Sequence, residues 1–152
     1  MSRAKKININ HLLGYQLKQT QHALRLHMDE ALRFLDLTTP QYAVLAQLEL
    51  RPGISNASLA RASFITAQTM HGIVSSLEKR GLVQRKKDPS HGRILCTELT
   101  GAGSKAVQQA HELIAKVEER MTSTMTDKER ALLAELLLAC FNSLNSSGMG
   151  LK

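Results

Sequence analysis

The hydrophobic pattern between Ser55 and Gly81 predicts two consecutive helices with a break between them. The first helix is short, and its apolar side consists of Leu59, Ala60 and Ala62. The period breaks at residues 63–65, Ser-Phe-Ile. Apolar residues then recur at the i, i+3, i+4, i+7 spacing of one buried helix face: Met70, Ile73, Val74 and Leu77. The other faces of this second helix carry short, uncharged residues, most of which can form hydrogen bonds: Gln68, Thr69, His71, Gly72, Ser75 and Ser76.

Capping and turn residues mark the ends of the second helix and of a hairpin that follows it. Thr66 is a good N-cap, because its hydroxyl accepts from an otherwise unpaired backbone N–H, and Gly81 closes the helix. Residues 82–85 and 94–99 are typical of two paired strands, and residues 86–92 between them hold the Asp, Pro, Ser and Gly of a turn. Arg93 starts the return strand. The order of helix, turn, helix and basic hairpin predicts a winged helix.

A helical pattern without proline precedes this stretch, from residue 9 to residue 35. Its main apolar stripe consists of Leu13, Leu17, Leu24, Met28, Ala31 and Leu35. The next helix begins near residues 38–41 in one of two ways. Either Thr39 is its N-cap, with Pro40 at the first helical position, or Thr38 and Gln41 form a capping box. This helix ends at residues 51–53, Arg-Pro-Gly.

Two more helices follow the hairpin, and the second of them is Leu-rich. Residues 100–103 are expected to form a loop into the first, and Thr126 with Glu129 forms a capping box for the second. The long helices at the two ends carry more apolar surface than one small domain buries, so we expect residues 1–36 and 104–145 to form a dimerisation domain. Residues 37–103 then form the winged helix-turn-helix, with a basic arm at residues 1–6 and a flexible tail at residues 146–152. The fold class is mainly α, with a small β component.

Charge is concentrated in the central stretch. The chain carries a formal net charge of +7, and residues 61–93 account for +5 of it, with seven basic and two acidic side chains. A basic patch beside a helix rich in hydrogen-bonding side chains is the electrostatic footprint of nucleic-acid binding. Aromatic residues are scarce, with no Trp, two Tyr and three Phe. This scarcity argues against a stacking surface for single strands.

Other classes of function find little support in the sequence. Cys96 and Cys140 match no metal or redox spacing, and no pair of the six histidines has a compact ligand spacing. There is no nucleophile elbow, phosphate loop or paired carboxylate in an apolar setting, so we expect neither an enzyme nor a cofactor. No apolar run approaches a membrane span and no signal peptide opens the chain, so a cytoplasmic protein is expected.

Several short motifs, taken together in their order along the chain, resemble those of the MarR-type transcriptional regulators. They are residues 37–45 (LTTPQYAVL), residues 77–83 (LEKRGLV), Asp88-Pro89, Arg93 and residues 99–103 (LTGAG). The resemblance covers roughly residues 10–145. It implies a homodimer with one winged helix per subunit, which usually represses transcription from a palindromic operator. It also implies release by a small, often aromatic anion that binds between the dimerisation helices and the winged helix.

The resemblance makes the helix from Thr66 to Arg80 the recognition helix and residues 85–93 the wing. The residues expected to contact double-stranded DNA are Thr66, Gln68, Thr69, His71, Ser75, Arg85, Lys86, Lys87 and Arg93. Gln reads adenine, Thr contacts the thymine methyl, and Arg93 suits a narrow minor groove. The expected effector site is a polar face of the first long helix, with Tyr15, Lys18, His22 and Arg25. Its cations and phenol suit an aromatic carboxylate.

Two departures from the family pattern stand out. The wing has His91-Gly92-Arg93 where relatives commonly have an acid before the basic pair, so Asp88 is the available acidic partner for Arg93. Position 72 is Gly where many relatives have Arg, which removes one expected DNA contact. Two alternative functions are a redox-sensing regulator of the same fold that uses Cys96, and an architectural protein that binds all duplexes alike.

Overall fold

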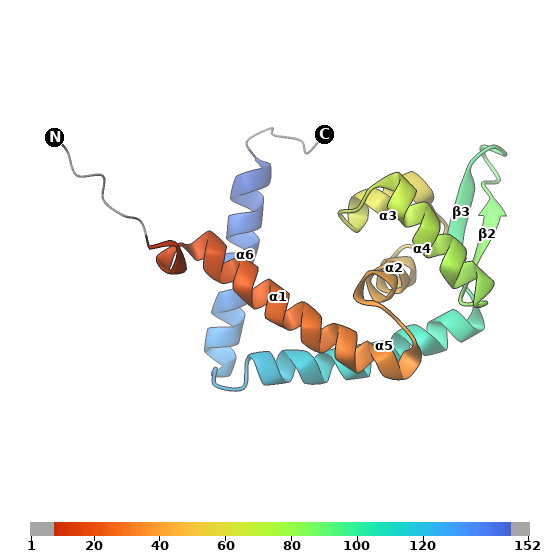
Figure 1. The fold of residues 1–152 in the computed structure, drawn as a ribbon. Helices are drawn as coiled ribbons and strands as arrows, with labels where there is room; N and C mark the ends of the chain where they lie inside the picture. The colour runs from red at the N-terminus through yellow and green to blue at the C-terminus, as the bar shows by residue number, and fades with distance from the viewer. Residues whose placement is uncertain (1–7, 147–152) are drawn as a thin grey trace. The chain divides into compact units, whose positions relative to one another are not determined.

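The computed structural model describes residues 8–146, and the chain forms two compact units, Met1–Val117 and Glu118–Lys152. The predicted basic arm and all but the first residue of the predicted tail lie outside the described residues. The helices and strands are η1 (Ile9–His11), α1 (Leu13–Leu32), η2 (Arg33–Leu35), α2 (Thr39–Leu50), β1 (Ile54–Ser55), α3 (Asn56–Ala62), α4 (Ala67–Lys79), β2 (Val83–Lys87), β3 (Leu95–Leu99), α5 (Gly101–Met121) and α6 (Asp127–Asn145). The predicted fold class, mainly helical with a small β component, is confirmed (Figure 1).

The sheet has three antiparallel strands in the order β1-β3-β2. In the hairpin Arg85 lies opposite Thr97 and Lys86 opposite Cys96, and β1 pairs with the other edge of β3 through Ile54 and Thr97. The sequence prediction placed Lys86 and Lys87 in the turn, but both belong to β2. It also missed β1, because a strand of two residues is too short to show an alternating pattern.

Polar side chains cap several of the described helices. Thr38 and Gln41 form the capping box of α2, which decides between the two starts considered from sequence and places Thr39 and Pro40 inside the helix. Thr66 caps α4 by accepting from the Thr69 N–H, as predicted. Thr126 and Glu129 cap α6, also as predicted.

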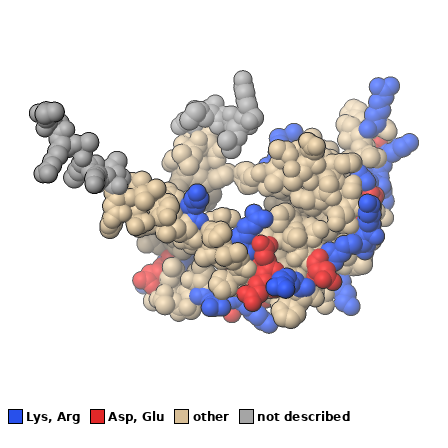
Figure 2. Space-filling view, in the orientation of Figure 1, with Lys and Arg blue, Asp and Glu red and all other residues tan. Residues whose placement is uncertain are grey.

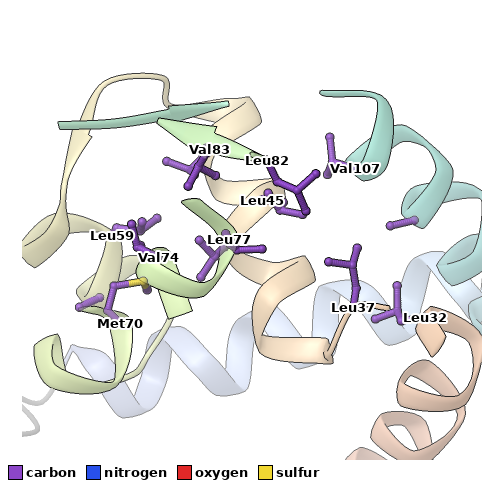
Figure 3. Close-up of a cluster of buried hydrophobic side chains, with 14 of the residues drawn as sticks. Leu32, Leu37, Leu45, Leu59, Met70, Val74, Leu77, Leu82, Val83 and Val107 are labelled. Atoms are coloured by element: carbon purple, nitrogen blue, oxygen red, sulfur yellow. The ribbon is translucent and has the colours of Figure 1, made fainter. Parts of the chain in front are cut away.

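The core of the first unit fixes α4 against its neighbours. Met70, Val74 and Leu77 of α4 are buried, together with Leu45 of α2 and Leu59 of α3. Figure 3 shows several of these side chains converging with Val83 of β2. Because one side of α4 is packed in this way, its opposite side is held at the surface in a fixed orientation.

Two glycines and one threonine hold the start of α5 against the beginning of the hairpin. Gly81 has φ +71, a left-handed conformation that favours glycine. The Thr100 hydroxyl donates to the Gly81 carbonyl at 2.6 Å and accepts from the Gly103 N–H at 3.0 Å. A Cβ at Gly103 would lie 1.9 Å from the Leu82 carbonyl oxygen. The second glycine of the Leu-Thr-Gly-Ala-Gly motif is therefore required for close packing. Helix α5 begins at Gly101, inside the segment that the sequence predicted to be a loop.

Large apolar side chains stay exposed on helices near both ends of the chain. On α6 they are Leu132, Leu136, Leu137, Leu138, Phe141 and Leu144, and each is between 45% and 77% exposed. On α1, Leu13 is 82% and Leu17 52% exposed. Apolar surface of this extent on a single chain is typical of an association interface. No helix within the described residues combines the length and hydropathy that a membrane crossing requires.

Candidate nucleic-acid interface

The polar side of α4 is presented to solvent at its first turns. Gln68, Thr69, His71 and Gly72 are exposed, and Met70 between them is fully buried. Thr66, the N-cap, is exposed too, and its hydroxyl donates to the Thr69 hydroxyl at 2.9 Å. The structure thus brings four of the residues predicted to contact DNA together at one end of one helix.

The second half of α4 is less accessible. Ser75 and Ser76 are half-buried, and the Ser76 hydroxyl accepts from the Gln41 side chain of α2 at 3.4 Å. Of the predicted contact residues on this helix, Ser75 therefore offers the least surface to an external partner.

Arg85 is engaged inside the first unit. Its guanidinium forms an ion pair with the Glu78 carboxylate of α4, with Nε donating to Oε2 at 2.9 Å. The hydrogen bond with Arg85 lowers the pKa of Glu78 below its usual value and raises the pKa of Arg85. The Arg85 side chain is 23% exposed. This pair joins β2 to α4 and so orients the hairpin relative to the exposed turns of that helix.

The remaining basic side chains of the hairpin are more accessible. Figure 2 shows Lys and Arg side chains gathered over the hairpin. The Lys86 ammonium pairs with Glu98 on β3, which lowers the pKa of that carboxyl, yet the Lys86 side chain stays 62% exposed. Lys87 and Arg93 are exposed, and no ion pair of either is formed with any residue in the range 8–146. Positive charge at the wing is thus available mainly at Lys87 and Arg93.

The expected pairing of Asp88 with Arg93 is wrong. The Asp88 carboxylate instead accepts from the Ser90 N–H at 2.7 Å, and its other oxygen lies 3.9 Å from the Cys96 thiol. The turn therefore uses Asp88 to satisfy its own backbone. The Arg93 guanidinium, which has no ion pair within residues 8–146, is accessible to an external partner.

Cys96 is half-buried on β3. Burial and the neighbouring Asp88 carboxylate raise the pKa of its thiol. A raised pKa lowers the population of thiolate, the form that reacts with peroxides. Among residues 8–146 there is also no group of three or more His, Cys, Asp or Glu side chains placed to hold a metal ion.

The polar face of α1 carries the four residues predicted to bind an effector. Tyr15 is half-buried, whereas Lys18, His22 and Arg25 are exposed. Arg25 lies 3.7 Å from Asp29, one helical turn away. Asp29 in turn accepts from the Thr39 hydroxyl at 2.5 Å and from the Thr39 N–H at 3.0 Å, and these bonds lower the pKa of Asp29. The candidate effector face is thereby linked to the first turn of α2.

Two polar links between helices were not recognised from the sequence. Arg80, at the end of α4, donates to the carbonyls of Asp36 and Leu35 at 2.6 and 3.0 Å, so it ties α4 to the segment between α1 and α2. His111 of α5 lies 3.0 Å from the Tyr42 hydroxyl and 2.8 Å from Glu49, both on α2. Neither link follows a short sequence spacing, since their partners are more than 40 residues apart, so no local pattern signals them.

Comparisons with known proteins identify relatives of this chain. A family model described as the MarR family matches residues 35–94. The HTH-type transcriptional repressor Rv2887 of Mycobacterium tuberculosis is 32% identical over 125 residues, which is 82% of this chain and 90% of that protein. The transcriptional regulator HosA of Escherichia coli is 31% identical over 131 residues, with 85% and 94% covered.

Solved structures show the same fold. The transcriptional repressor CouR, bound to a 23-mer DNA duplex, superposes with a TM-score of 0.82 at 28% identity and covers 91% of this chain and 99% of that chain. The Rv2887 complex with salicylic acid superposes with a TM-score of 0.71 at 31% identity, and the shares covered are 85% and 96%.

Proposed function

This chain belongs to the MarR family of DNA-binding transcriptional regulators, and from that premise we propose that it is a homodimeric repressor released by an aromatic acid. The observation that carries the DNA-binding part is the exposed polar side of α4 next to a hairpin with accessible Lys87 and Arg93. A regulator of this kind acts on chromosomal DNA, so we assign it to the cytoplasm. We assign it no catalytic role, since its relatives are transcriptional regulators.

The proposed DNA contacts divide into base and phosphate contacts. Gln68, Thr69 and His71 read base edges in the major groove from the first turns of α4, where helix-turn-helix proteins place such residues. Thr66 and Ser75 donate hydrogen bonds to DNA phosphates at the two ends of that contact. Such contacts with phosphates position a protein without carrying sequence information.

At the wing, the accessible charges supply affinity. Lys86 and Lys87 neutralise phosphates, and Arg93 enters the minor groove, where narrow A·T-rich tracts concentrate negative potential. The ion pair with Glu78 makes Arg85 mainly an orienting residue. It sets the angle between hairpin and α4, and its remaining exposed surface allows only a secondary phosphate contact.

The dimer would bury the exposed apolar residues of α1 and α6, with residues 1–36 and 104–145 as the dimerisation region and residues 37–103 as the DNA-binding domain. Two-fold symmetry suits the function, because a dimer presents two recognition helices about one DNA turn, ~34 Å, apart or a multiple of it. A palindromic operator is the expected partner.

The effector site is proposed on the polar face of α1. The salicylic acid bound to the mycobacterial relative supports a small aromatic acid as the effector class. The carboxylate would bind Arg25 and Lys18, with Tyr15 and His22 beside the ring. An anion at Arg25 competes with Asp29 for the guanidinium. Asp29 also accepts a hydrogen bond from Thr39 of α2, and Arg80 of α4 donates to the Asp36 carbonyl just before α2. Displacement of Arg25 from Asp29 would therefore be transmitted to the recognition helix through these hydrogen bonds.

Replacing Arg25 with alanine should reduce the stabilisation by an aromatic acid by more than half. Salicylate should raise the melting temperature of the wild-type protein, since a ligand that binds only the folded state stabilises it by mass action. Arg25→Ala should show less than half of that shift in a thermal-shift titration, because the carboxylate loses its charged partner. Arg33→Ala, a change of an exposed arginine on η2, is the control and should respond as the wild type does. Equal shifts in all three proteins would place the acid elsewhere.

The proposed function as a whole is tested by competition binding. The purified protein is titrated with duplex DNA from its own upstream region and with scrambled duplex, at increasing salt. We expect a preference of at least about 10³-fold for the upstream duplex, with affinity that falls steeply as salt rises. Equal affinity for both duplexes would favour an architectural DNA-binding protein, and no duplex binding would reject the proposal.

A redox-sensing regulator is the second candidate, because Cys96 lies on β3, three residues after the wing. The raised pKa of its thiol argues against it. Treatment with hydrogen peroxide before the same titration should therefore leave the affinity unchanged, and a loss that dithiothreitol reverses would favour the redox function.

A further inference from the structure

Phe64 stands out in the turn between α3 and α4. Its backbone φ is +56, in the left-handed region that side chains rarely adopt, and its side chain is 75% exposed. Glycine or asparagine adopts this conformation at lower cost. A large apolar ring gains nothing from water at this degree of exposure. The backbone here is thus less stable than it would be with glycine or asparagine, and most of the ring surface is in contact with water.

The surrounding turn holds this ring at the surface. The Ser63 N–H donates to the Leu59 carbonyl at 3.0 Å, and the Ile65 N–H donates to the Ala60 carbonyl at 3.1 Å. Ile65 packs against the hydrophobic core. With backbone hydrogen bonds on both sides and the next side chain anchored, the conformation of Phe64 is set by the fold.

The position of the turn shows what the ring can meet. Phe64 lies two residues before Thr66, the N-cap of α4, and the exposed residues Gln68 and Thr69 follow within one helical turn. In helix-turn-helix proteins this end of the recognition helix approaches the base edges. The apolar groups that DNA offers there are the thymine C5-methyl and the deoxyribose, and phenylalanine is among the residues that contact the thymine methyl.

We propose that Phe64 is a DNA-contacting residue, whose ring packs on an apolar group of the duplex, a thymine methyl or a deoxyribose, at the edge of the groove entered by α4. The inference rests on the proposed function and adds a contact to it. A strained, exposed aromatic residue at this turn is accounted for if the complex with DNA buries the ring.

The test uses Phe64→Asn, which removes the ring and suits the left-handed backbone. The probe is a duplex that the wild-type protein selects from a random pool. We expect Phe64→Asn to keep or raise the melting temperature and to weaken binding to this duplex by about 10²-fold, because a dimer loses two good base contacts, each worth about tenfold. Leu50→Asn, a change at a leucine 73% exposed on α2 and outside the proposed dimerisation region, is the control and should bind as the wild type does.

The two candidate DNA groups, a thymine methyl and a deoxyribose, are distinguished by replacing each thymine of the selected duplex in turn with deoxyuridine. If the ring contacts a methyl, one replacement weakens wild-type binding but leaves binding by Phe64→Asn unchanged. If it contacts deoxyribose, no replacement has this effect while Phe64→Asn still binds weakly. An unchanged affinity of Phe64→Asn for the selected duplex would overturn the inference. Failure of the wild type to select any duplex would instead reject the proposed function.

Discussion

Replacing Lys87 and Arg93 together with glutamine should reduce the affinity for duplex DNA on the order of 10³-fold at 0.1 M salt. Both side chains are exposed, and neither is ion-paired within residues 8–146, so each can displace counterions from the duplex, Lys87 at a phosphate and Arg93 in the minor groove. A slope of about −0.9 in log K against log salt makes each contact worth about eightfold between 0.1 and 1 M. A dimer loses four contacts. Gel-shift titration at several salt concentrations measures both the affinity and the slope.

The same charge change elsewhere is the control for the double variant. Lys105 and Lys116 are exposed on α5, and replacing both with glutamine should leave the affinity within about threefold of wild type, since charges far from the duplex are largely screened. Comparable losses in the two double variants would show that net charge, and not the wing, supplies the affinity.

Replacing Gly103 with alanine should destabilise the fold by about 3 kcal/mol or more, at the upper end of the range for overpacking. The added Cβ would lie 1.9 Å from the Leu82 carbonyl oxygen, and this atom belongs to the backbone, so no side-chain rotation relieves the clash. Separating α5 from Leu82 would also break the bonds of the Thr100 hydroxyl to Gly81 and Gly103. Thermal unfolding followed by circular dichroism should show a melting temperature lower by roughly 10 °C.

Gly101→Ala is the matched control for that change, because it adds the same methyl group to the same helix turn. A Cβ at Gly101 meets no atom within 4 Å. Its melting temperature should equal or slightly exceed that of the wild type. Equal melting temperatures for Gly103→Ala and the wild type would contradict the close contact between α5 and Leu82.

Local patterns in the sequence predict much of the fold. The period of Met70, Val74 and Leu77 and the cap at Thr66 locate α4 within one residue, because helix burial and capping act over a few residues. The start of α2 stays ambiguous in sequence, since Thr38 and Thr39 are both good caps. The structure resolves this with Asp29, which accepts from Thr39 inside the helix. Contacts between distant residues decide such cases.

The candidate site is less predictable than the fold. Basic residues of the wing are visible in the sequence, but which of them are free depends on cross-strand and helix–strand partners. Glu78 engages Arg85, and Glu98 engages Lys86. Asp88 is taken by its own turn, which leaves Arg93 unpaired within the described residues. The role of each charge thus follows from the tertiary structure.

Hydroxyl-radical footprinting of the selected duplex, combined with the mass of the complex, shows whether α4 and the wing, brought together in pairs, read double-stranded DNA. We expect two chains per duplex and two protected stretches whose centres are about 10 base pairs, ~34 Å, or a multiple of it, apart. Both stretches should fade with the Lys87 and Arg93 variant. A single chain per duplex with one protected stretch, or protection that survives loss of both charges, would contradict this mode of binding.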